Sequence, residues 1–163
     1  MLFIASTVAI GQSKYPNVQI FESTGLNYPV CEPSISISKT EPNVMVAGAV
    51  LKYVYRSEDG GLTWASKKMR SRHGVYGDPC IVSDLKGHFH YFHLSDPTGL
   101  GWGSPWILDR IVCQTSKSSG KRWSRGSSIG QLMTKVGWSK VDTVMRYVGV
   151  GDLSAINSQA NYR

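Results

Sequence analysis

The chain has 163 residues and a net charge of +7, with a sequence pI near 9.4. A basic surface of this kind could attract anionic glycans or nucleic acid. However, the densest basic run, residues 67–73, has no interleaved aromatic residues of the kind that stack on single-stranded nucleic acid. We therefore interpret it as a solvated outer strand and expect no nucleic-acid partner. The three cysteines, Cys31, Cys80 and Cys113, show no metal-ligand spacing, so we expect neither a metal site nor a cofactor.

The first predicted element is the apolar run at the N-terminus, residues 2–10. It has the length of a signal peptide and is well below the ~20 residues that a membrane-spanning helix needs. Because no Lys or Arg precedes it, a shortened secretion signal and an ordinary strand both remain open. We predict a truncated signal over residues 1–12, which would place the protein in the periplasm or outside the cell, with no membrane span.

Residues 13–126 contain a repeated β unit. The segment 31–37 matches 77–83, each with an acidic residue before a proline, and 43–47 matches 88–92. Alternation with period two in 34–38 and apolar or aromatic runs in 44–50 and 88–93 are typical of strands. We predict one unit over about 31–68, a second over about 77–124, and a partial strand at 18–22.

Each unit contains the same short motif before its last strand, at 57–64 and at 116–123. The shared residues are Ser57, Gly61 and Trp64 in the first copy and Ser116, Gly120 and Trp123 in the second, and the first copy also has Asp59. Glycine supplies the positive φ that a tight hairpin requires, and an Asp side chain can accept hydrogen bonds from the same turn. The second copy is degenerate because Ser118 stands in the place of the aspartate.

This motif resembles the Asp-box, or BNR repeat, of the sialidase (glycosyl hydrolase-like) superfamily. The resemblance implies a mainly β fold of two to three blades of a sialidase-like β-propeller, with Asp59 in a structural role. Closed propellers have about four to eight blades, so the set would be incomplete and its missing blades would come from another chain or an oligomer. The implied function is recognition of exposed, sialylated glycans or exo-glycosidic hydrolysis of the exo-α-sialidase type.

The residues expected to touch glycan lie at the blade starts and in an insertion. Glu32 and Asp78 precede the first strands, and paired carboxylates can perform glycosidase acid and base chemistry; the alternative is that they only hydrogen-bond the crossing between blades. The insertion contributes Trp102, Trp106, Asp96 and Arg110, which either contact sugars or anchor the loop.

The sequence leaves open whether this chain hydrolyses glycosides. Sialidases carry a Phe/Tyr-Arg-Ile-Pro motif near the N-terminus, whereas this chain has no arginine before Arg56. We therefore expect weak or absent hydrolysis by the isolated chain. A non-catalytic propeller that binds glycan or protein is the alternative.

Residues 127–163 change to helical periodicity and predict a short helical hairpin. Apolar residues recur with helical spacing at 129, 132, 133 and 136, and again at 141, 144, 145 and 148. The stretch 127–152 resembles the C-terminal end of tyrosine recombinases, with Trp138 nine positions before Tyr147. This resemblance implies a tyrosine nucleophile for a DNA phosphodiester, but the His-x-x-Arg element of that family is absent. A DNA-processing tail is thus a second alternative.

Overall fold

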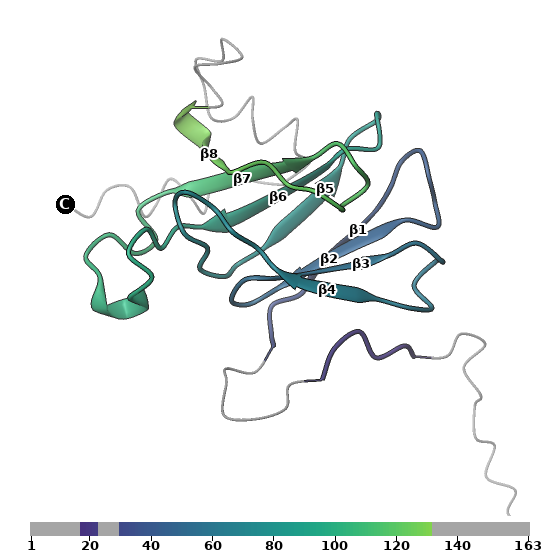
Figure 1. Ribbon diagram of the computed structural model, residues 1–163, viewed down its shortest axis with the longest axis horizontal. Coiled ribbons are helices and arrows are strands. Elements are labelled where there is room, and N and C mark those ends of the chain that lie inside the picture. The colour runs from purple at the N-terminus through teal and green to yellow at the C-terminus, as the bar shows by residue number, and fades with distance from the viewer. Residues whose placement is uncertain (1–16, 23–29, 132–163) are drawn as a thin grey trace, which may run out of the picture.

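The computed structural model describes residues 17–22 and 30–131, and this part of the chain is mainly β (Figure 1). It forms two four-stranded antiparallel sheets, each with its strands in chain order. The first sheet consists of β1 (Ser34–Ile37), β2 (Met45–Ala49), β3 (Tyr53–Ser57) and β4 (Ala65–Lys68). The second consists of β5 (Cys80–Ser83), β6 (Phe89–Leu94), β7 (Ile111–Ser116) and β8 (Ser127–Ser128), with a 3₁₀ turn, η1 (Gly101–Gly103), between β6 and β7. The predicted mainly β class and its two repeated units are confirmed at this level.

The two sheets stack with their first strands, β1 and β5, side by side (Figure 1). The side-chain oxygen of Ser34 accepts a hydrogen bond from the backbone N–H of Ile81 at 2.9 Å. Gly48 in β2 lies so close to the second sheet that a Cβ there would be 2.7 Å from the ring of Tyr91. The sheets are therefore in van der Waals contact at a position where only glycine fits.

A core of apolar side chains fills the space between the sheets. The members of this core are Val44, Val46, Val54, Met69, Val75, Ile81, Phe89 and Tyr91. Val46, Phe89 and Tyr91 have no exposed surface, and full burial of a large apolar side chain contributes about 1.5–3 kcal/mol. The alternation along each strand thus supplies the face on which the two sheets associate.

The opposite face of the first sheet carries a smaller cluster. Ala47, Ala49 and Tyr55 are buried there, with Ile20, Val30, Tyr53 and Trp64 packed against them. The segment 17–22 is not a strand, contrary to the expectation for 18–22. It contributes side chains instead, and the ring of Phe21 lies 5.5 Å from that of Tyr53.

The C-terminal boundary of the second sheet also differs from the expectation. Ser127 and Ser128 form β8, which pairs with Val112 and Cys113 of β7, so the sheet extends past residue 126. The predicted helical hairpin, with Trp138 and Tyr147, lies outside the described residues, as does the predicted signal at 1–12. No helix among the described residues is both long enough and apolar enough to cross a membrane.

Candidate functional site

Glu32 and Asp78 hold equivalent positions immediately before the first strand of each sheet. Both have a left-handed backbone, with φ of 51° and 48°. This conformation is uncommon for residues other than glycine and costs on the order of 1–3 kcal/mol. Its recurrence at both positions indicates that the chain enters β1 and β5 through the same strained corner.

The two acidic side chains meet across the junction between the sheets. The pKa of Glu32 is raised above its ordinary value, first by a side-chain hydrogen bond with Asp78 and then by the charge of that carboxylate. Two carboxyl groups in hydrogen-bond contact share one proton when the pH permits. The structure thus brings together the two residues that the sequence proposed as catalytic.

The turn between β2 and β3 fixes this arrangement. The backbone N–H of Val50 donates to the carbonyl of Cys31 at 3.1 Å, and the N–H of Gly77 donates to the carbonyl of Leu51 at 2.6 Å. Cys31 directly precedes Glu32 in the sequence, and Gly77 directly precedes Asp78. The backbone around residues 50–51 therefore holds both corners against each other.

Residues of the same turn also line a pocket of about 370 Å³. Leu51 and Lys52 line it from the first sheet, and Tyr76 and Trp102 line it from the second. Trp102 is 75% exposed and meets Tyr76 edge to face, with ring centroids 5.9 Å apart. An exposed indole beside a cationic side chain offers a stacking surface and a partner for an anionic group.

The four residues predicted to contact glycan divide into two pairs. Asp96 lines the pocket with Trp102, but its carboxylate accepts hydrogen bonds from the backbone N–H groups of Gly99 and Gly101. Asp96 is buried and thus shapes the loop. Trp106 and Arg110 are not among the lining residues.

Arg110 is engaged by its neighbour in the sequence. Its guanidinium pairs with Asp109, and this hydrogen bond lowers the pKa of Asp109. The Asp109 carboxylate also accepts a hydrogen bond from the hydroxyl of Ser95. Arg110 is therefore bound into the base of the insertion.

The motif at 57–64, called the first box below, forms a hydrogen-bonded hairpin between β3 and β4. The Ser57 hydroxyl accepts from the N–H of Gly61 at 2.9 Å and donates to the Asp59 carboxylate at 2.8 Å. The hydroxyl and backbone N–H of Thr63 donate to Asp59 as well, and together these bonds lower the pKa of Asp59 to about 2. The indole N–H of Trp64 donates to the carbonyl of Gly61. Every polar group of Asp59 is used within the turn.

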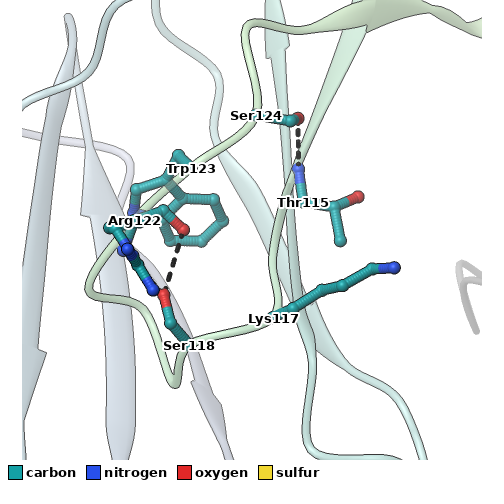
Figure 2. A pocket seen from close by; sticks show the side chains of 6 residues that line it. All are labelled: Thr115, Lys117, Ser118, Arg122, Trp123 and Ser124. Carbon is teal, nitrogen blue, oxygen red and sulfur yellow. Dashed lines mark hydrogen bonds between the residues drawn. The ribbon is translucent and has the colours of Figure 1, made fainter.

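The second box, between β7 and β8, keeps this pattern without an aspartate. The Ser116 hydroxyl accepts from the N–H of Gly120 at 2.9 Å. Figure 2 shows Ser118 hydrogen-bonded to Arg122 across the hairpin, where Asp59 contacts Thr63 in the first box. Box residues of the second copy line a shallow pocket of about 340 Å³.

The two box tryptophans occupy equivalent places. Trp64 packs on the β2–β3 cluster that contains Ala47, and Trp123 packs edge to face on Tyr91, with ring centroids 5.9 Å apart. In each sheet the box serine pairs with a residue of the second strand. Ala47 and Tyr91 hold equivalent positions, because each lies two residues after that paired residue. The indole N–H of Trp123 is buried and has no hydrogen-bond partner among the described residues, whereas that of Trp64 donates to Gly61.

Glu58 and Asp84 make polar contacts that the sequence motifs do not predict. Glu58 binds Arg56 at 2.5 Å and Lys121 at 3.0 Å, so it connects the first box to the second. Asp84 contacts both His88 and His90. The contact between Glu58 and Lys121 joins residues far apart in the sequence, and no local pattern indicates it.

The described residues contain no group of three His, Cys, Asp or Glu side chains arranged to hold a metal ion. The three cysteines are free thiols. Comparison of the chain with protein-family models, curated proteins and solved structures yields no match.

Proposed function

We propose that the two sheets are consecutive blades of a sialidase-like, BNR-repeat propeller that recognises exposed glycans outside the cytoplasm. The observation that carries this proposal is the repeat itself. Both sheets have four antiparallel strands in chain order, and in both a box hairpin joins the third strand to the fourth. The side-by-side first strands are consistent with neighbouring blades around an axis.

Exposed apolar side chains on the outer face of the first sheet support the presence of a further blade. Ile81 of β5 is 4% exposed because the first sheet covers it, whereas Ile35, at the equivalent position of β1, is 56% exposed. Ile37, which points to the same face of β1, is also exposed. A preceding blade, from another chain or another copy, would cover these side chains as the first sheet covers Ile81.

The carboxyl pair and the pocket define the proposed glycan site. Trp102 would stack on a sugar ring, Lys52 would pair with the carboxylate of a sialic acid, and Glu32 and Asp78 would accept hydrogen bonds from sugar hydroxyls.

Binding is favoured over hydrolysis for a geometric reason. Glycosidases that use two carboxyl groups hold them about 5 Å apart or more, with the substrate between them. Here the side chains of Glu32 and Asp78 interact directly with each other, and this interaction raises the pKa of Glu32. We therefore propose weak or absent turnover by this chain.

Titration of intrinsic tryptophan fluorescence with sialyllactose tests the proposal, with lactose as the sugar control. Trp102→Ala should weaken binding about fivefold, since an aromatic contact contributes about 1 kcal/mol. Trp106→Ala is the matched control because Trp106 is exposed outside the pocket, and it should bind as the unmodified chain does.

Two results would change the proposal. Saturable binding that neither tryptophan substitution weakens would place the glycan elsewhere. Robust cleavage of a fluorogenic sialoside, abolished by Asp78→Asn, would make the chain an enzyme.

A further inference from the structure

A hydroxyl, an imidazole and a carboxylate are joined by hydrogen bonds on the second sheet. The Nδ1 atom of His90 lies 3.1 Å from the hydroxyl oxygen of Thr115, and its Nε2 atom lies 3.3 Å from the carboxylate of Asp84. His90 and Thr115 face each other in the β6–β7 register, and Asp84 lies in the turn before β6. The imidazole thus stands between a nucleophile and a carboxylate, which is the order of groups in hydrolytic triads.

This cluster lies on the face of the second sheet that points away from the first. Tyr91 contacts the first sheet at Gly48, and side chains alternate along a strand, so His90 points to the opposite side. The cluster is therefore separate from the carboxyl pair and the pocket of Trp102.

The hydrogen bonds of Asp84 set the tautomer of His90. One carboxylate oxygen of Asp84 accepts from the backbone N–H groups of Lys86 and His88, and the other contacts the rings of His88 and His90. Burial acts to raise the pKa of Asp84, but these bonds outweigh it and lower the pKa. A charged Asp84 accepts from Nε2–H of His90, which leaves the lone pair of Nδ1 directed at the hydroxyl of Thr115.

The cluster is accessible, and a cation lies beside it. The side chain of His90 is 23% exposed and that of Asp84 is 19% exposed. Lys117, which is exposed, follows Thr115 by two residues, and Figure 2 shows both side chains extending to the same side of β7. Two residues along a strand span about 7 Å, which fits a carboxylate separated by a few bonds from an ester carbonyl.

A neighbouring thiol does not compete as a nucleophile. Cys113 is buried next to Thr115, and burial raises its pKa to about 12, so the reactive thiolate is absent at neutral pH. The hydroxyl of Thr115 is thus the one activated nucleophile in this cluster.

We propose that Thr115, His90 and Asp84 hydrolyse small carboxylic esters whose acyl group carries a second carboxylate, which Lys117 binds. His90 takes the proton of the Thr115 hydroxyl as its oxygen attacks the ester carbonyl, and the proton then passes to the departing alcohol as the ester C–O bond breaks. Water, deprotonated by His90, cleaves the acyl-threonine, and the proton returns to Thr115. Asp84 is a positioning residue. The activity goes beyond glycan recognition and does not depend on it.

The test uses the full chain and two chromogenic substrates, the mono-4-nitrophenyl ester of succinic acid and neutral 4-nitrophenyl acetate. We expect turnover of the anionic ester and, by mass spectrometry of the quenched reaction, a succinyl group on Thr115. His90→Gln should lower kcat/KM about 100-fold or more. Asp84→Asn should lower kcat with little change in KM. Lys117→Gln should reduce the preference for the anionic ester, and Lys68→Gln, which removes an equal charge from an exposed residue of the first sheet, should not.

Thr115→Val and Thr115→Ser separate catalysis from folding, because circular dichroism checks the fold of each. A folded Thr115→Val chain should be inactive, and Thr115→Ser, which keeps the hydroxyl, should be active. Activity that survives Thr115→Val, an acyl group found on Lys117 instead of Thr115, or a folded wild-type chain without turnover of either ester would overturn the proposal.

Discussion

Gly48→Ala is the sharpest perturbation of the contact between the sheets. The added Cβ would lie 2.7 Å from the ring of Tyr91, 3.0 Å from Pro79 and 3.1 Å from Ile81. Tyr91 has no exposed surface and Pro79 is buried, so neither can move away freely. Overpacking of this kind costs about 1–3 kcal/mol, and the loss of glycine's flexibility in the unfolded chain offsets about 0.5–1 kcal/mol of that. We expect a net loss of about 1–2 kcal/mol in the free energy of unfolding.

Urea denaturation followed by tryptophan fluorescence measures this loss. With a slope of about 1–3 kcal/mol/M, the midpoint should fall by about 0.3–2 M. Gly103→Ala is the matched control, because a Cβ at Gly103 would meet nothing within 4 Å, and its midpoint should stay the same or rise slightly because alanine restricts the unfolded chain. A Gly48→Ala chain as stable as the wild type, or more stable, would refute the stacking of the sheets at this position.

Two further predictions concern the boxes and the carboxyl pair. Ser57→Ala and Ser116→Ala should each cost about 1–3 kcal/mol in urea denaturation, because each leaves a backbone N–H of the hairpin without its acceptor; an unchanged midpoint for either would contradict the equivalence of the boxes. Glu32→Gln should raise the thermal unfolding temperature at neutral pH and have little effect near pH 4. The folded-state pKa of Glu32 is raised by Asp78, so its contribution to stability is present at low pH and is lost as the pH rises through that pKa. A variant less stable than wild type at neutral pH would show that the two carboxylates do not repel.

The hairpins and the repeat could be predicted because their signals are local. Glycine, serine and tryptophan at fixed offsets in 57–64 and 116–123 determine the turn, and the hydrogen bonds of Ser57 and Ser116 are completed within five residues. β8 could not be predicted, since two serines carry no apolar alternation and pair only because β7 offers an open edge. The strand predicted at 18–22 was wrong, although the segment is apolar. Its apolar residues pack on Tyr53 and Tyr55, and its backbone does not pair with another strand.

The site was predictable in part. The repeat placed Glu32 and Asp78 at matching positions, but their contact follows from the stacking of β1 on β5, which the sequence does not specify. The hydrogen bond between His90 and Thr115 depends on the register of β6 and β7, a tertiary property that a one-residue shift would abolish.

The two box-bearing sheets pack face to face as neighbouring repeats, and nuclear Overhauser contacts across their interface test this packing most directly. A Cβ on Gly120 would lie 2.6 Å from a methyl carbon of Val46, so the methyl protons of Val46 and the α protons of Gly120 are close across the interface. We expect a strong cross-peak between the methyl protons of Val46 and the α protons of Gly120, and another between the α protons of Gly48 and the ring protons of Tyr91. Assigned spectra that show the strand pairings within each sheet but neither of these cross-peaks would contradict this packing.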